Sequence, residues 1–138
     1  MIIKKILIPT DGSANSLIAL EYGIYIARKL GASLQGLYVI DVNLIQEPLI
    51  TDISGSLGMP PYEGFFETIQ KSMEEKADLI LKEFMDKCQI SGVKAETKKA
   101  IGKISSVIID EAQNADLIVM AKKGEHFHLT EGGLLGSV

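Results

Sequence analysis

The sequence is poor in the residues that stabilise secreted or membrane-inserted proteins. Its 138 residues include one cysteine, Cys88, and no tryptophan. A single thiol forms neither an intrachain disulfide nor a cysteine-rich zinc site, which argues against a secreted disulfide scaffold. No apolar run approaches the roughly 18 residues of a membrane helix, and the first residues lack a signal-peptide cleavage site. We therefore predict a cytoplasmic protein with no membrane partner.

Basic charge is also scarce, because the sequence has 14 lysine and arginine residues and 18 acidic residues, which gives a net charge of −4. A nucleic-acid binder is usually basic, so we expect no nucleic-acid partner. The content of 46% apolar and 23% charged residues is that of an ordinary globular protein. A chain of this length has room for one hydrophobic core, and we predict a single domain over residues 1–138.

Hydrophobic patterning predicts strands alternating with helices. Short, β-branched apolar runs indicate strands at 2–8, 33–40, 93–100 and 116–120, and helical spacing indicates helices at 13–31, 64–90 and 105–114. Cys88 falls on the apolar stripe of the second helix and is predicted to be a core residue. Residues 43–64 contain three prolines and no sustained period, which predicts a long loop. This order is typical of a doubly wound α/β fold, with a mainly parallel sheet and helices on both faces.

Doubly wound folds bind ligands at the carboxyl ends of their strands. Lysines gather near these predicted ends, at positions 98, 99, 103, 122 and 123. They indicate either an anion site or simple solvation of a surface. Glycines at 124, 132, 133 and 136 favour the first interpretation, because backbone N–H groups approach a phosphate closely at such residues. Asp11 follows the first strand, where it either accepts hydrogen bonds from a ligand or forms a plain turn.

Several catalytic motifs are missing from the sequence. It contains no G-x-x-x-x-G-K-[ST] loop, no G-x-G-x-x-G after the first strand and no G-x-S-x-G elbow. His126 and His128 lie two residues apart on a glycine-rich stretch without a third ligand, so we interpret them as exposed polar residues and expect no metal site. No general base is evident, and no catalytic residue is predicted.

Five segments together carry a family resemblance. They are Lys5–Ser13 (KILIPTDGS), Leu37–Asp41 (LYVID), Gly102, Ala115–Met120 (ADLIVM) and Leu135–Val138 (LGSV). With these motifs the chain resembles the universal stress protein family, in its single-domain, ATP-binding form. The resemblance implies an adenine nucleotide alpha hydrolase-like, Rossmann-like fold. It also implies an ATP-binding regulatory protein of the stress response that forms a homodimer. The nucleotide would bind with or without Mg²⁺.

The resemblance further implies which residues form the ATP site. Asp11 and the backbone at Val39 would hold adenine and ribose, Ala121 and Gly124 would line the ribose and α-phosphate, and Gly136 and Ser137 would bind the outer phosphates. The complete implied set is Pro9, Thr10, Asp11, Ser13, Val39, Met120, Ala121, Lys122, Gly124, Gly136, Ser137 and Val138.

The sequence departs from the family pattern at its carboxyl end. The family signature is G-x2-G-x9-G-[ST], whereas this chain has Ala121 at the first glycine and 11 residues between Gly124 and Gly136. The sequence given ends at Val138, so we expect the domain to lack the family's final helix and edge strand. A truncated chain and one half of a tandem protein are both compatible with that ending.

Two other functions are also compatible with the sequence. One is an interaction module of the same fold without a nucleotide, acting through residues 43–64 and a dimer surface, which the alanine at position 121 favours. The other is an ATP hydrolase or adenylyl transferase. The sequence lacks the S-G-G-x-D-S and H-x-G-H elements of such enzymes. We therefore expect a protein that is not an enzyme, with at most slow ATP hydrolysis.

Overall fold

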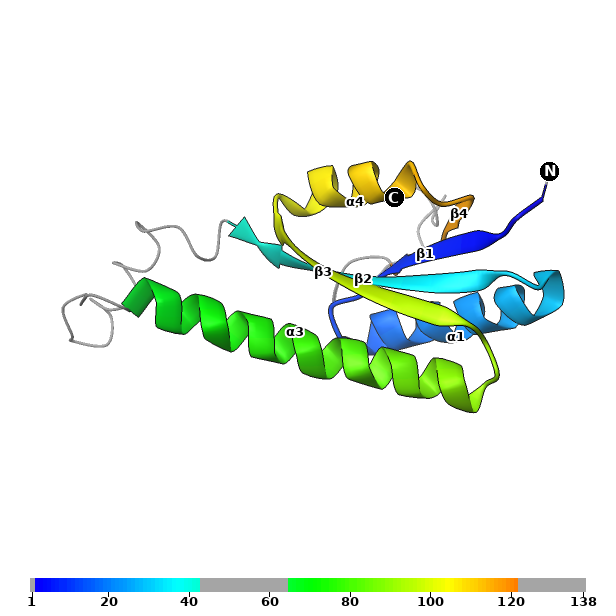
Figure 1. Ribbon diagram of the computed structural model, residues 1–138, viewed down its shortest axis with the longest axis horizontal. Coiled ribbons are helices and arrows are strands. Elements are labelled where there is room, and N and C mark those ends of the chain that lie inside the picture. The colour runs from blue at the N-terminus through cyan, green and yellow to red at the C-terminus, as the bar shows by residue number, and fades with distance from the viewer. Residues whose placement is uncertain (1, 43–64, 122–138) are drawn as a thin grey trace, which may run out of the picture.

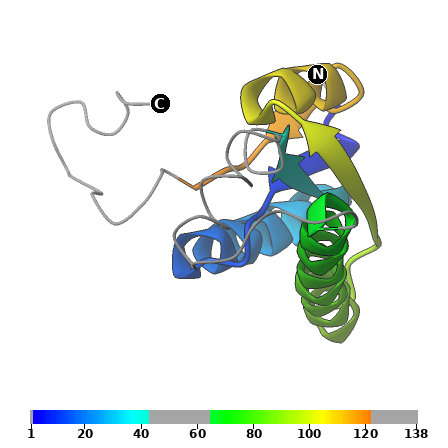
Figure 2. The same ribbon diagram turned by 90° about the vertical axis from the view of Figure 1, so that its left-hand side faces the viewer.

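The computed structural model describes residues 2–42 and 65–121 of the chain. These residues form a four-stranded parallel sheet in the order β3-β2-β1-β4. The strands are β1 (Lys5–Pro9), β2 (Ser33–Asp41), β3 (Ala95–Gly102) and β4 (Leu117–Ile118), and the helices are α1 (Ala14–Leu30), α3 (Phe65–Ile90) and α4 (Ile104–Ala112). Helices α1 and α3 cover one face of the sheet and α4 covers the other (Figures 1 and 2). The predicted doubly wound α/β fold is confirmed.

The first β-α-β unit has the signals that its sequence predicts. Ser13 caps α1, with its Oγ accepting a hydrogen bond from the Ser16 N–H at 3.2 Å. At the other end Gly31 adopts a left-handed conformation with φ 68° and donates its N–H to the Ala27 carbonyl, as glycines at helix ends commonly do. The helix therefore begins and ends where local chemistry dictates, and β2 follows directly.

The core lies between the sheet and the α1–α3 layer. Ile6, Leu7 and Ile8 of β1 are fully buried, because a central parallel strand is covered on both faces. Ile6 and Ile8 form one hydrophobic cluster with Phe84 and Cys88 of α3. Burial raises the pKa of the Cys88 thiol to about 11, so the group remains protonated at neutral pH. Cys88 is a core residue, as its place on the apolar stripe predicts.

The structure corrects several element boundaries. β1 begins at Lys5 and not at residue 2, and β4 comprises two residues and not five, because its pairing with β1 involves only Ile6 and Leu7. β3 lies two residues later than predicted, since this edge strand is mostly exposed and has a weak apolar pattern. α4 covers Ile104–Ala112, whereas we predicted 105–114. The predicted loop at 43–64 lies outside the described residues. Within the described part of the chain, no helix has the length and hydropathy of a membrane span.

Candidate functional site

A crevice of about 300 Å³ opens at the carboxyl ends of the strands. The chain runs outward from β1 to β2 and β3 and then returns through α4 to β4 on the other side of β1. The strand order therefore reverses between β1 and β4, which is where doubly wound folds place their ligands. Figure 2 views the sheet from this end. The crevice is lined by Pro9, Thr10, Asp11, Ser13, Ser16, Leu37, Val39, Ile104, Ile108, Met120 and Ala121.

The turn between β1 and α1 gives the crevice its polar wall. Asp11 Oδ1 accepts hydrogen bonds from the Ser13 N–H at 2.9 Å and from the Ser16 hydroxyl at 2.7 Å. Gly12 lies between these groups with φ 82°, a conformation that favours glycine. The Asp11 Oδ2 atom takes part in neither hydrogen bond. The turn therefore fixes the carboxylate at the mouth of the crevice through one of its two oxygens.

The Asp11 carboxylate is ionised at neutral pH. Partial burial alone would raise its pKa, but the hydrogen bonds from Ser13 and Ser16 outweigh burial and hold the pKa below its ordinary value. The negative charge also affects Tyr38 on β2, whose pKa is raised by burial first and by the Asp11 charge second. Asp11 is thus an acceptor of hydrogen bonds and a weak base.

The remaining walls of the crevice are apolar. Leu37 and Val39 come from β2, Ile104 and Ile108 from α4, and Met120 follows β4. Four of the lining residues are not among those predicted from the sequence, namely Ser16, Leu37, Ile104 and Ile108. A usable signal existed for the two isoleucines, because they lie four residues apart at the start of a helix that begins at a carboxyl strand end.

The predicted site residues fall into two groups. Pro9, Thr10, Asp11, Ser13, Val39, Met120 and Ala121 all line the crevice, although they come from three separate parts of the sequence. Lys122, Gly124, Gly136, Ser137 and Val138 lie outside the described residues, as do His126 and His128. The structure therefore brings together the part of the predicted site that would hold adenine and ribose, and the assignment of these residues to a ligand remains a prediction.

Two of the lysines predicted at a strand end, Lys98 and Lys99, lie in the middle of β3. Lys98 forms an ion pair with Glu111 on α4, and Lys99 pairs with Asp78 and Glu74 on α3. Successive residues of a strand point to opposite faces, so the two ammonium groups lie on opposite sides of the edge strand β3. The prediction of a shared anion site is wrong for these residues, because their side chains lie on opposite faces of β3 and each pairs with a carboxylate. Within the described ranges, no cluster of three or more His, Cys, Asp or Glu residues is arranged to hold a metal ion.

Comparison with known sequences gives a consistent result. Residues 3–138 match the universal stress protein family model. Universal stress protein MJ0531 of Methanocaldococcus jannaschii is 36% identical over 137 residues, which cover 98% of this chain and 72% of that protein. Universal stress protein Slr1230 of Synechocystis is 27% identical over 139 residues, which cover 95% of this chain and 48% of that protein. The chain therefore spans only part of each of these relatives.

Solved structures share the fold at low sequence identity. The hypothetical protein MJ0577 superposes with a TM-score of 0.69 at 24% identity, covering 91% of this chain and 78% of that one. An Arabidopsis thaliana universal stress protein family protein with AMP bound superposes with a TM-score of 0.61 at 18% identity, covering 88% of this chain and 78% of that one. A universal stress protein in complex with cAMP superposes with a TM-score of 0.58 at 18% identity, covering 86% of this chain and 72% of that one. The family model that matches residues 3–138 and the 36% identity to MJ0531 show that the chain belongs to the universal stress protein family.

Proposed function

We propose that the crevice binds an adenine nucleotide, with ATP as the physiological ligand, and that the protein acts as a nucleotide-dependent regulator in the stress response. The observation that carries the proposal is the convergence of Asp11 and an apolar wall at the point where the strand order reverses. The volume of about 300 Å³ is at the lower end of the range for small-molecule sites, which suits a nucleoside.

The lining of the crevice suits the adenosine part of the ligand. Leu37, Val39, Ile108 and Met120 offer apolar surface to a planar base. Asp11, ionised and exposed, accepts hydrogen bonds from an amino group or a ribose hydroxyl through Oδ2. AMP and cAMP, the ligands of two structural neighbours, share the adenosine part, which supports this assignment.

The described lining offers little to phosphates or to a magnesium ion. It contains no lysine or arginine, and Asp11 is its only carboxylate. Mg²⁺ sites on nucleotides usually combine one or two carboxylates with phosphate oxygens, so Asp11 alone fits the nucleoside better than the ion. We assign phosphate binding to Gly124, Gly136 and Ser137, which lie beyond the described residues.

We propose that the nucleotide is bound without rapid turnover. An efficient general base has a pKa near the working pH, whereas the pKa of Asp11 is lowered by its hydrogen bonds despite partial burial. Asp11 therefore holds the ligand and does not activate water. A phosphate-release assay on the purified protein should show no more than slow hydrolysis, and several turnovers per second would contradict this part of the proposal.

Isothermal titration of the purified chain with ATP, AMP, adenosine and GTP tests the binding site. We expect adenosine to retain part of the ATP affinity and GTP to bind more weakly. Asp11→Ala should weaken ATP binding about tenfold or more, because a hydrogen bond to a charged acceptor contributes roughly 1.5–3 kcal/mol and 1.4 kcal/mol corresponds to a factor of ten. Asp11→Asn keeps an acceptor for the Ser13 N–H and should bind with intermediate affinity.

A matched control is Asp78→Ala, which removes another exposed carboxylate that does not line the crevice. Its affinity for ATP should equal that of the parent. The absence of ATP binding by the parent chain would refute the proposal and would favour the interaction module without a nucleotide. Homodimerisation, which we also propose for this protein, is measured separately by sedimentation equilibrium with and without ATP.

A further inference from the structure

One wall of the crevice comes from a part of the fold that is only partly buried. We define the α4–β4 unit as residues 104–121. It supplies Ile104, Ile108, Met120 and Ala121 to the crevice lining. No residue of α4 is buried, and Ile104 and Met120 remain 44% and 50% exposed. Leu117 and Val119 pack against the core while partly buried, but the more exposed side chains contribute little to fixing the position of the unit. Polar contacts therefore add to its attachment.

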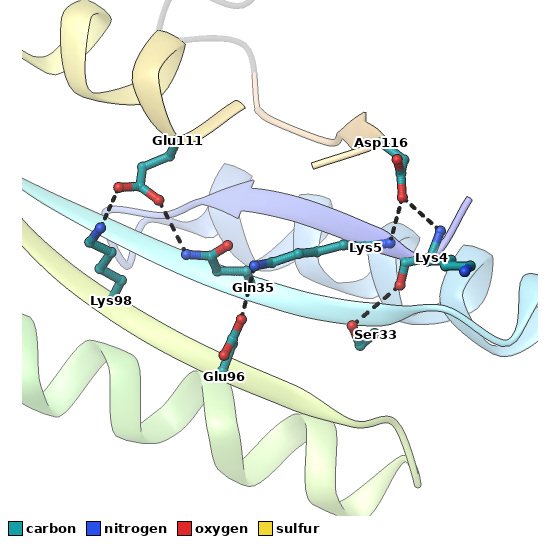
Figure 3. Close-up of polar contacts among 8 residues, drawn as sticks. All are labelled: Lys4, Lys5, Ser33, Gln35, Glu96, Lys98, Glu111 and Asp116. Carbon is teal, nitrogen blue, oxygen red and sulfur yellow. Dashed lines mark hydrogen bonds and ion pairs between the residues drawn. The ribbon is translucent and has the colours of Figure 1, made fainter. Parts of the chain in front are cut away.

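The first of these contacts is the Asp116 carboxylate at the start of β4. Its Oδ2 accepts hydrogen bonds from the backbone N–H groups of Lys4 and Lys5, at 2.9 and 3.1 Å (Figure 3). The Asp116 N–H donates in turn to the Lys5 carbonyl at 2.8 Å. β4 pairs with β1 over two residues only. The carboxylate therefore adds two charge-assisted hydrogen bonds to one of the shortest possible strand pairings.

The second contact is the Glu111 carboxylate on the last turn of α4. Its Oε2 binds the Lys98 Nζ at 2.5 Å, and its Oε1 accepts from the Gln35 Nε2 at 3.5 Å (Figure 3). Gln35 is buried on β2, while Lys98 lies on the edge strand β3. Glu111 thus connects α4 to β2 and β3. Asp116, five residues later, connects the start of β4 to β1.

We propose that Glu111 and Asp116 are positioning residues of the nucleotide site, an inference that rests on the function proposed above. Neither side chain lines the crevice. Asp116 lies four residues before Met120, about 13 Å away if the chain between them is extended. A shift of the β4 register or of the α4 axis moves the four crevice residues of the unit together, without altering Asp11 or the β1–α1 turn.

The experiment compares Asp116→Ala, Asp116→Asn and Glu111→Ala with the parent chain. The ATP affinity is measured by titration, at a temperature where circular dichroism shows every variant to be folded. Asp116→Ala should bind ATP about tenfold more weakly, the equivalent of one hydrogen bond to a charged group. Asp116→Asn keeps a carbonyl acceptor for the backbone N–H groups and should recover most of this loss. Asp78→Ala is the control, because it breaks a carboxylate–lysine pair on the opposite face of the sheet.

Amide hydrogen exchange provides a readout that does not require a ligand. The Val119 N–H donates to the Leu7 carbonyl at 3.0 Å, and the Leu34 N–H donates to the Lys94 carbonyl at 2.9 Å. Asp116→Ala should accelerate exchange at Val119 and leave Leu34 protected, because only the β1–β4 pairing is weakened. An equal loss of protection at both amides would indicate general destabilisation and would overturn the inference.

The two proposals fail in distinguishable ways. If the parent chain does not bind ATP, the proposed function is refuted, and the exchange at Val119 alone decides whether Asp116 fixes β4. If the parent binds ATP and Asp116→Ala and Glu111→Ala bind it equally well, the positioning role is refuted and the nucleotide site is retained. A loss of affinity in Asp78→Ala as large as that in Asp116→Ala would also refute the positioning role.

Discussion

The substitution Gly23→Ala tests how the middle of α1 packs against β1. A Cβ atom at Gly23 would lie 2.3 Å from the Ile8 Cδ1 and 3.4 Å from its Cγ1. Ile8 is fully buried, so its side chain has little room to move away. Overpacking of this kind costs about 1–3 kcal/mol. Replacing a glycine in the middle of a helix by alanine recovers about 1 kcal/mol of helix propensity. We expect Gly23→Ala to lower the free energy of unfolding by about 0–2 kcal/mol.

The second substitution, Ile8→Val, removes the Cδ1 atom that would clash. Alone it should cost about 0.5–1.5 kcal/mol, because it leaves a small cavity. In the double variant the new methyl group occupies that cavity, so the clash disappears while the gain in helix propensity is kept. The double variant should be at least as stable as Ile8→Val, with a favourable coupling energy of about 1 kcal/mol or more.

Urea unfolding followed by far-ultraviolet circular dichroism measures all four chains. Equal m-values would show that only the stability of the native state has changed. The packing argument is refuted if the two substitutions are additive within about 0.3–0.5 kcal/mol, which is the behaviour of residues that do not touch.

The remaining predictions concern titration, the thiol and the helix cap. Backbone hydrogen bonds from Lys4 and Lys5 lower the pKa of Asp116, and hydrogen bonds from Ser13 and Ser16 lower that of Asp11 despite partial burial. Both carboxylates therefore stabilise the fold above their ordinary pKa of 3.8, and this contribution is lost as the pH falls through the lowered values. Thermal unfolding should show a smaller acid-induced decrease in Tm for Asp11→Ala/Asp116→Ala than for the parent. With its pKa raised to about 11 by burial, Cys88 should react with iodoacetamide only as fast as the protein unfolds, and rapid labelling of the folded chain would contradict this. Ser13→Ala should lower the free energy of unfolding by about 1 kcal/mol, measured in urea, because it removes the α1 cap.

Much of the fold was predictable from the sequence, because helix caps and strand patterns depend on residues that are near one another in the chain. The α1 boundaries follow from Ser13 and Gly31, whose capping geometry depends only on neighbouring residues. β1 was recognisable because a central parallel strand is apolar on both faces. The ends of β3 and β4 were misjudged, since an edge strand keeps weak patterning and the length of β4 depends on its pairing with Ile6 and Leu7.

The site was only partly accessible from the sequence. The resemblance to a family selected Asp11, Val39 and Ala121, which the fold brings to one crevice. Lys98 and Lys99 were misinterpreted, because a sequence gives the position of a charge along the chain but not the carboxylate that faces it. The spacing of Ile104 and Ile108 was a usable signal for one face of α4, but only the path of α4 across the sheet decides that this face lines the crevice.

The sequence by itself therefore determined the order of the elements, the capping of α1 and the turn that holds Asp11, all of which depend on contacts between near neighbours in the chain. Only the tertiary structure decided which charges are paired and which apolar residues face the crevice. It also decided how Glu111 and Asp116 attach the α4–β4 unit to the sheet. The Asp116 carboxylate binds the backbone of Lys4, 112 positions away in the sequence, and a contact of that separation exists only once the sheet has formed.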